Sequence, residues 1–319
     1  SRPHFPLTAP QRHFSRYWPE GVNEPRITAG SGDSATHPMT QGAIAGFRTN
    51  EIEREEGLRA RAAYFACVDF LDELLGDFLV RLERDGALDN TIIVYASDHG
   101  EMCGEHGLWW KNTWHESSVR VPLIISTPEH RRGEVDAAII SDPVGLADLF
   151  PTFCGFAGIE PPDDLDGVDL SGPSRSEASS ALMQRPGTIT ESLMPRWGEG
   201  TEFRLIRSRR HKYVMFRDAD DLAFDLQADP DEQRNLLAHG EGGAETDALR
   251  SHLLEDFDFA TVEQNRTTQT QDLRARFPLR TEATTPNQIQ RGDGLLVEAD
   301  SPLYDADVVS RDVDADFDR

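Results

Sequence analysis

The chain has 319 residues, of which 57 are acidic and 32 basic, so its formal net charge at pH 7 is −25. This length allows one large α/β domain or two smaller ones, with a sizeable core. So acidic a surface argues against nucleic acid or an anionic membrane as a partner. Lys111 and Lys212 are the only lysines. An acid-rich, lysine-poor composition suits a halophilic protein in a very salty cytoplasm; an ordinary acidic protein explains the charge but not the scarcity of lysine.

Three cysteines, Cys67, Cys103 and Cys154, lie far apart and are odd in number, so no disulfide framework is expected. No run approaches the roughly twenty apolar residues of a transmembrane helix. The chain begins with Ser1 rather than Met, so a targeting segment would lie upstream. Localisation therefore stays open, with the cytoplasm slightly favoured.

Residues 1–50 are rich in Pro, Gly, His and Ser, which predicts loops and short turns. Over 58–85, apolar residues recur at three- and four-residue steps and predict a helix. Gly86 suits the position just after that helix. The apolar run at 91–96 predicts a buried strand. A helix that leads into a buried strand is half of a βαβ unit, so we expect a largely parallel sheet flanked by helices.

Further along, a second strand is predicted at 122–127, a helix at 143–157 and a polar linker at 172–187. Short strand-like runs then suggest an antiparallel sheet, at Thr188–Glu191, Phe203–Arg207, Tyr213–Phe216 and Leu222–Asp225. A helix follows at 245–258, and no strong pattern is seen beyond about 260. The aspartate-rich end, 300–319, predicts disorder. We therefore expect three parts: an α/β domain over 1–187, an antiparallel subdomain over 188–260 and a partly irregular tail over 261–319.

The predicted strand at 91–96 ends in Ser97-Asp98-His99-Gly100. In open α/β sheets, ligands bind at this end of the strands. Asp98 and His99 are therefore candidate metal ligands, although the carboxylate could instead cap a helix and the imidazole be satisfied by hydrogen bonds. Oxygen ligands favour Ca²⁺ or Mg²⁺, and a histidine also admits Mn²⁺.

The run Thr91–Lys111, TIIVYASDHGEMCGEHGLWWK, together with the NTWHESSVRVPLIIS that follows, resembles the sulfatase family of the alkaline-phosphatase-like superfamily. The similarity is ordered along the chain and rests on Ser97–Gly100, Gly104–Lys111, Trp114–Glu116 and Arg120–Ile124. Residues 204–236 also resemble the sulfatase C-terminal subdomain. The resemblance implies an alkaline-phosphatase-like α/β fold with a small C-terminal antiparallel α+β subdomain.

It also implies metal-dependent hydrolysis of small sulfate monoesters, with Ca²⁺ as the first choice and Mg²⁺ or Mn²⁺ as alternatives. Asp98 and His99 would be metal ligands, joined in the family by acidic residues from the N-terminal part. Lys111 matches the lysine that contacts the sulfate oxygens. His4, in Ser-Arg-Pro-His-Phe-Pro, matches the histidine beside the ester oxygen, where an imidazole can give a proton to a departing alkoxide. The alternatives are a solvated lysine and a loop histidine without a role.

The nucleophile of the family is a formylglycine made from the first residue of a C/S-x-P-S/A-x-R motif, and none of the three cysteines lies in such a motif. The similarity is thus to the later half of a sulfatase. We expect this chain alone to be inactive, with the other half lying upstream, forming a separate partner chain or having been lost. The alternatives are a phosphonate or phosphodiester hydrolase of the same superfamily, or a non-catalytic remnant or subunit that binds a partner chain.

Overall fold

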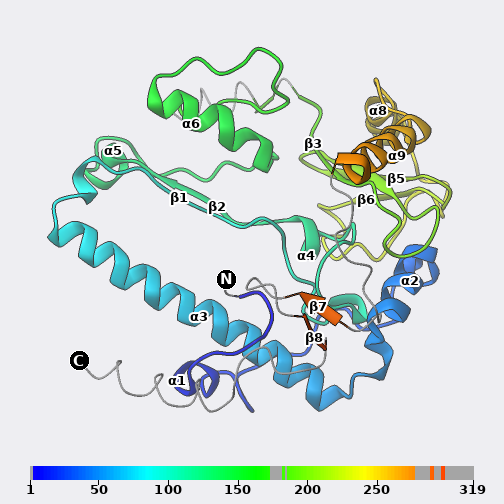
Figure 1. Ribbon diagram of the computed structural model, residues 1–319, viewed down its shortest axis with the longest axis horizontal. Helices are drawn as coiled ribbons and strands as arrows, with labels where there is room; N and C mark the ends of the chain where they lie inside the picture. The colour runs from blue at the N-terminus through cyan, green and yellow to red at the C-terminus, as the bar shows by residue number, and fades with distance from the viewer. Residues whose placement is uncertain (1–2, 173–181, 184, 277–287, 291–295, 299–319) are drawn as a thin grey trace. The chain divides into compact units, whose positions relative to one another are not determined.

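The computed structural model describes residues 3–172, 182–183, 185–276, 288–290 and 296–298 (Figure 1). The chain divides into two compact units, residues 1–259 and residues 260–319. Within the described ranges, no helix has both the length and the apolar character needed to cross a membrane.

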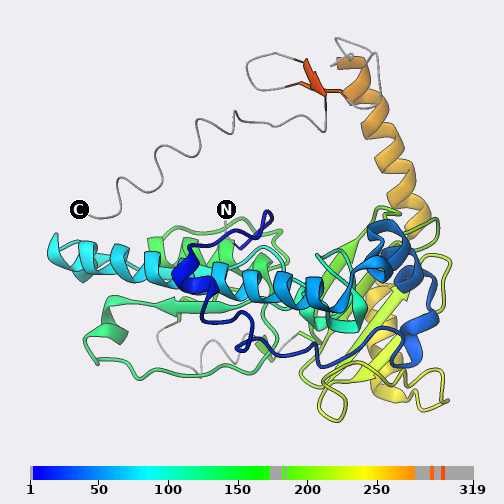
Figure 2. The same ribbon diagram turned by 90° about the horizontal axis from the view of Figure 1, so that it is seen from below.

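The first unit begins with three helices: α1 (Gln11–Phe14), α2 (Pro38–Phe47) and α3 (Arg54–Arg84). The predicted helix at 58–85 is confirmed as α3, a single long helix (Figure 2). It ends as the sequence suggested, with Gly86 at a φ of 69°, where glycine avoids the strain of a side chain. The loops expected over 1–50 are interrupted by α1 and α2. In α2, Pro38 takes the first position and the His37 ring accepts from the Met39 N–H at 3.2 Å.

Two strands follow α3, namely β1 (Ile93–Ala96) and β2 (Leu123–Ser126), and both were predicted to within two residues. They pair antiparallel, and β1 is half-buried throughout. The expected parallel pairing of the sheet is thus absent among the described strands. The connection over 97–122 holds only a 3-10 turn and the four-residue α4 (Glu116–Val119). This connection returns the chain antiparallel to β1. A parallel pairing would need a longer crossover that carries the chain across one face of the sheet.

Short helices then lead toward the second sheet: α5 (Pro128–Arg131) and α6 (Leu149–Ala157). The helix predicted over 143–157 is confirmed at its later end, where a 3-10 turn at Leu146–Asp148 precedes α6. Most of the linker predicted at 172–187 lies outside the described residues.

The predicted antiparallel sheet is confirmed in the order β3-β4-β5-β6. Its strands are β3 (Thr188–Ser192), β4 (Phe203–Arg207), β5 (His211–Phe216) and β6 (Leu222–Asp225). Every residue of β5 is buried, because both faces of the sheet are covered. Val214 and Phe216 face one core with Met39 of α2 and Trp114. Tyr213 and Met215 face the other core, which includes Leu249 of α8 (Ala244–Leu253).

The second unit contains most of α9 (Phe259–Arg276) and a two-stranded antiparallel ladder of β7 (Gln288–Gln290) and β8 (Leu296–Glu298). The sequence did not predict α9, because its side chains are polar all round and give no apolar stripe. The disorder predicted for 300–319 concerns residues outside the described ranges.

Candidate functional site

Asp98 and His99 lie just beyond the carboxyl end of β1. The His99 Nδ1 lies 2.9 Å from the Gly100 carbonyl oxygen. Since a carbonyl only accepts, Nδ1 carries the hydrogen, and the lone pair of Nε2 is left available. This nitrogen is 3.5 Å from Oδ2 of Asp98, whose side chain is 84% exposed. The backbone N–H of His99 donates to the other carboxylate oxygen, Oδ1, at 3.0 Å.

These two side chains suit a shared cation. A metal-bound histidine commonly gives its second N–H to a carbonyl or carboxylate, which fixes the ring. The Gly100 carbonyl plays that part here, with Nε2 and the carboxylate on the same side. In the described part of the chain, no group of three or more His, Cys, Asp or Glu side chains could hold a metal. Asp98 and His99 therefore fit as part of a coordination sphere and do not complete one.

The backbone of Gly100, which lies just after β1, packs against α4. Its N–H donates to the Ser118 carbonyl at 2.8 Å, and a Cβ at this position would lie 2.1 Å from the Ser117 carbonyl oxygen. Its φ is not among the positive values of the chain. Glycine is required here by this close approach.

Lys111 and His4 are in direct contact, with 3.0 Å between the lysine Nζ and the histidine Nε2. The His4 Nδ1 donates to the Phe5 carbonyl at 3.0 Å, so Nε2 accepts from the ammonium group. The His4 ring also lies 6.4 Å from the His99 ring, measured between centroids. The structure therefore brings together all four residues selected from the sequence: His4, Asp98, His99 and Lys111.

The residues on both sides of Lys111 have strained backbone conformations. Its neighbours Trp110 and Asn112 have φ values of 67° and 68°, a region that costs a non-glycine residue roughly 1–3 kcal/mol. Glu101 secures one side by accepting from the Trp110 N–H at 2.6 Å and the Cys103 N–H at 3.1 Å. Burial raises the pKa of Glu101, and these two N–H groups oppose the rise. The sequence gave no signal for Glu101, because its partners are backbone groups brought near by the loop.

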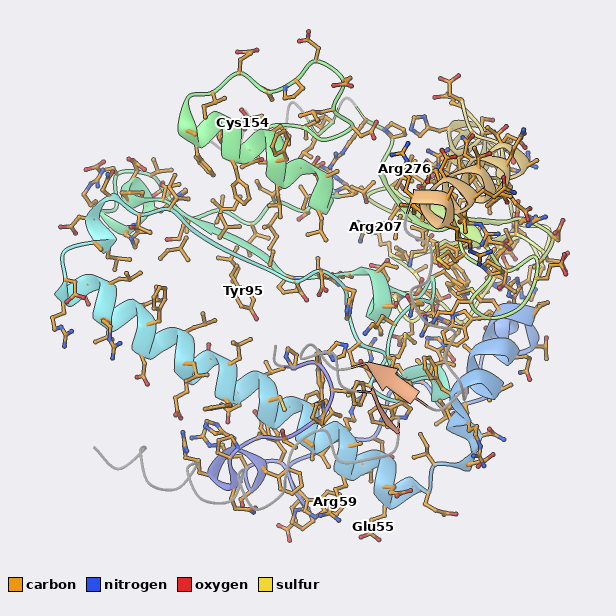
Figure 3. The ribbon with its side chains drawn as sticks, viewed as in Figure 1. Glu55, Arg59, Tyr95, Cys154, Arg207 and Arg276 are labelled. Atoms are coloured by element: carbon orange, nitrogen blue, oxygen red, sulfur yellow. The ribbon has the colours of Figure 1, made fainter. Side chains whose placement is uncertain are left out.

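A buried ion cluster connects the segment that follows Lys111 to the four-stranded sheet β3–β6. Lys212 of β5 is fully buried, and its ammonium contacts Glu116 Oε1 at 2.7 Å, Glu232 Oε1 at 2.6 Å and the Trp114 carbonyl at 2.9 Å. These contacts use all three donors of a lysine. Glu232 also accepts from the Glu116 N–H at 2.7 Å. Glu116 thus has a structural role. Arg207 of β4, labelled in Figure 3, adds a longer contact to Glu116 at 3.7 Å.

His106 and His115 stabilise the same segment from within. Their rings lie 4.2 Å apart, and His115 stacks on Trp114 at 3.7 Å. Burial lowers the pKa of His106 to about 4 and that of His115 well below its usual value. Both rings are therefore neutral packing groups at pH 7. The backbone N–H of His106 donates to the Ile27 carbonyl at 2.8 Å and so helps to order the loop.

The cysteines are poorly placed for chemistry. Cys67 is buried in α3, and its thiol contacts the Thr8 carbonyl at 3.4 Å. Burial raises the pKa of Cys103 to about 12, so this thiol stays protonated. Cys154 lies on α6, labelled in Figure 3, away in sequence from the site segment.

A polar recess of about 420 Å³ lies on another part of the first unit. It is lined by groups from the 26–27, 105–106, 116–120 and 230–232 segments. His4, Asp98, His99 and Lys111 are not in its lining. This recess is therefore lined by residues other than the four candidates.

Comparisons with known proteins identify the family of this chain. A family model described as Sulfatase matches residues 1–159, and one described as N-sulphoglucosamine sulphohydrolase, C-terminal, matches residues 104–258. An arylsulfatase of Clostridium perfringens is 29% identical over 81% of this chain and 52% of its own length. A choline-sulfatase of Rhizobium meliloti is 34% identical over 61% of this chain and 36% of its own length. The chain thus spans about half, or less, of the length of these relatives.

Solved structures show a similar fold. The phosphonate monoester hydrolase of Agrobacterium radiobacter matches 93% of this chain and 59% of its own, with a TM-score of 0.60 at 25% identity. A protein solved with its substrate D-glucosamine-2-N,6-O-disulfate matches 67% of this chain and 44% of its own, with a TM-score of 0.52 at 28% identity. The two family models together extend over residues 1–258. The chain therefore belongs to the sulfatase family and has its alkaline-phosphatase-like fold.

Proposed function

We propose that this chain supplies the metal-binding strand end, the anion-binding lysine and the leaving-group histidine of a hydrolase for sulfate monoesters. The observation that carries the proposal is the contact of Lys111 with His4 at 3.0 Å, beside the Asp98–His99 pair. A cation, an ammonium and an imidazole at one point suit an ester that carries a negative charge and leaves behind an alkoxide.

In this proposal, Asp98 and His99 hold a divalent cation, with Ca²⁺ as the first choice and Mg²⁺ or Mn²⁺ as alternatives. When bound, the cation neutralises charge on the ester oxygens. The Lys111 ammonium donates to the sulfate oxygens and stabilises the charge that develops on them. His4 in its protonated form keeps Nδ1 on the Phe5 carbonyl and gives the Nε2 proton to the departing oxygen.

In this proposal, the nucleophile comes from elsewhere. Cys67 and Cys103 are buried, and no cysteine of the sequence lies in a formylglycine motif. A formylglycine carried by another part of the protein, or by a partner chain, would supply the attack on sulfur. The span of about half of the relatives' length supports this arrangement. We accordingly propose that the 319-residue polypeptide alone does not turn over.

Exposed apolar side chains support a partner or a further segment. Phe78 and Val80 of α3, Ile124 of β2 and Phe150 of α6 are each more than half exposed. Exposed apolar side chains can take part in contacts with other protein segments. A non-catalytic subunit that binds a partner through these faces is the second candidate function.

A phosphonate or phosphodiester hydrolase is the remaining candidate, favoured by the extent of the match to phosphonate monoester hydrolases at TM-scores of 0.60 and 0.61. Both chemistries need a cation and an anion-binding group, so the substrate decides between them. Among sulfate esters, the names of the relatives suggest aryl, choline and sugar sulfates as classes to test.

The test compares 4-nitrophenyl sulfate with 4-nitrophenyl phenylphosphonate as substrates. The native gene product is purified as the cell makes it, treated with a chelator and assayed with Ca²⁺, Mg²⁺ or Mn²⁺ restored. We expect metal-dependent hydrolysis with the sulfate preferred, and loss of it in Lys111→Met. Preference for the phosphonate would favour that hydrolase instead. If no ester is hydrolysed while a second chain copurifies, the chain is a binding subunit.

A further inference from the structure

Beside Lys111 lies a set of aromatic rings that the hydrolysis proposed above does not use. Trp110, the residue next to Lys111, lies 5.1 Å from Phe5 and 4.0 Å from Phe47, measured between ring centroids. Phe47 in turn lies 4.7 Å from Trp197. These four residues come from the N-terminal segment, the end of α2, the Lys111 loop and the β3–β4 connection. We call them the aromatic wall.

The aromatic wall has a fixed base and accessible rings. Trp197 is buried, and its indole N–H donates to the Asn112 carbonyl at 2.6 Å, one residue after Lys111. α2 packs closely on it, since a Cβ at Gly42 would lie 1.9 Å from the Trp197 carbonyl oxygen. Phe5, Phe47 and Trp110 are only partly buried. A half-exposed aromatic group on a rigid base is suited to stack against a planar or ring-shaped ligand.

Arg196 adds a positive charge to this wall. Its guanidinium lies 5.3 Å from the Trp197 ring and 6.0 Å from the Phe47 ring, and the residue is exposed. Its guanidinium has no ion pair or hydrogen bond within the described part of the chain. Arg204, Arg210 and Arg217, by contrast, are paired with carboxylates. An arginine stacked on aromatic rings keeps its donors available for a planar anionic group.

We propose that the aromatic wall and Arg196 bind the alcohol part of the substrate, and that this alcohol is a ring bearing a second negative charge. The inference rests on the proposed function, which places the sulfate at Lys111. The ring would then lie against Trp110 and Phe47, next to the sulfate, and its carboxylate or second sulfate would meet Arg196. A quaternary ammonium alcohol such as choline is disfavoured, because the guanidinium repels a cation that the aromatic rings alone would attract.

The test measures binding by the full chain with isothermal titration calorimetry. Four probes are compared: sodium sulfate, 4-hydroxybenzoate, 4-sulfooxybenzoate and choline sulfate. The variants are Arg196→Gln and Phe47→Leu, and Arg81→Gln of α3, an exposed arginine distant in sequence, serves as the matched control. Phe47→Leu keeps an apolar side chain at a position that packs on the core and so guards against misfolding, while Arg196 is at the surface.

We expect Arg196→Gln to weaken both benzoates by about tenfold, the typical value of a charge-assisted hydrogen bond. We expect Phe47→Leu to weaken them by roughly fivefold through the lost ring contact. Binding of sodium sulfate should stay within about twofold of wild type in both variants, and choline sulfate should bind no better than sulfate. Arg81→Gln should change nothing.

The outcomes distinguish a failure of the ring subsite from a failure of the proposed sulfate site. If sulfate binds but 4-hydroxybenzoate does not, or if Arg196→Gln behaves like Arg81→Gln, the ring subsite is wrong and the sulfate site stands. If 4-hydroxybenzoate binds through Arg196 while sulfate shows no binding, the subsite stands and the sulfatase site is contradicted. Tighter binding of choline sulfate than of 4-sulfooxybenzoate also overturns the inference.

Discussion

The Lys111 Nζ lies 3.0 Å from the Nε2 of His4, although 107 positions separate the two residues in the sequence. Neither side chain has a carboxylate partner among the described contacts. A cationic ammonium next to an imidazole nitrogen, in a chain with 57 acidic residues, makes the space beside Lys111 and His4 suited to bind an anion. This pair gives the first prediction.

Replacing His4 by Gln should slow hydrolysis according to how poor the leaving group is. General-acid catalysis contributes roughly 10²–10⁴-fold when an alkoxide needs a proton. For the native gene product, we expect kcat/KM for an alkyl sulfate to fall by about 100-fold, and kcat/KM for 4-nitrophenyl sulfate by less than about tenfold. Lys111→Met is the matched comparison, because it should lower both values similarly. Equal losses for the two substrates in His4→Gln would remove the proton-donor role.

Asp98→Asn and His99→Asn should weaken the binding of divalent cations, each by roughly tenfold or more, as for other losses around metal sites. The two variants should differ in selectivity. Losing the imidazole should reduce Mn²⁺ affinity more than Ca²⁺ affinity, since Ca²⁺ prefers oxygen ligands. Calorimetric titration of the native gene product with each metal checks this, with His252→Asn of α8 as the control. Unchanged metal binding in both variants would show that the ions are held elsewhere.

Lys212→Met should lower the free energy of unfolding by about 3–5 kcal/mol, the usual cost of leaving a buried charge without its partner. Glu116 and Glu232 would then face each other with no cation between them. Adding Glu232→Gln to Lys212→Met should recover part of the loss, because one of the two carboxylates is then neutral. Urea unfolding followed by tryptophan fluorescence measures both variants. A change below about 1 kcal/mol in Lys212→Met, as for an exposed pair, would contradict the buried cluster.

Acidification should destabilise the first unit through its buried histidines. His106 has a pKa lowered to about 4, against 6.5 in an unfolded chain, so unfolding takes up a proton between these values. Its contribution to stability is complete above pH 6.5 and is lost as the pH falls toward 4. Between pH 7 and 5 the loss from this residue should be about 2 kcal/mol. His115, whose pKa is also lowered by burial, adds to it.

The matched variant is His106→Asn, since asparagine tolerates the positive φ of 56° at this position. Its free energy of unfolding should fall less steeply than that of the wild type between pH 7 and 5. Parallel pH profiles for the two proteins would show that His106 does not titrate in this way.

Much of the fold could be predicted from local patterns. The periodicity of α3, the run of β1 and the short strands β3 to β6 are all visible in the sequence, because each buries a regular face. α9 was missed because it has no apolar face, and α2 because the Pro, Gly, His and Ser residues of 1–50 suggested loops. The antiparallel pairing of β1 with β2 could not be predicted from strand composition, which does not specify direction.

Residues of the candidate site could be predicted where a family motif includes them. Residues whose role depends on tertiary contacts could not. His4, Asp98, His99 and Lys111 were all selected from the sequence, and the structure brings them together. Glu101 and Arg196 had no such signal, because their roles depend on which backbone and rings the fold places beside them. Lys212 stood out only as one of two lysines in the chain.

The central claim is that His4 and Lys111 act at one sulfate-ester site, and a double-mutant cycle tests it most directly. The native gene product, His4→Gln, Lys111→Met and the double variant are assayed with an alkyl sulfate as substrate. The account predicts that each single change lowers kcat/KM strongly and that the double variant is clearly less impaired than the product of the two losses, because the residues act as a unit. Wild-type activity in both single variants, or losses that simply multiply, would contradict it.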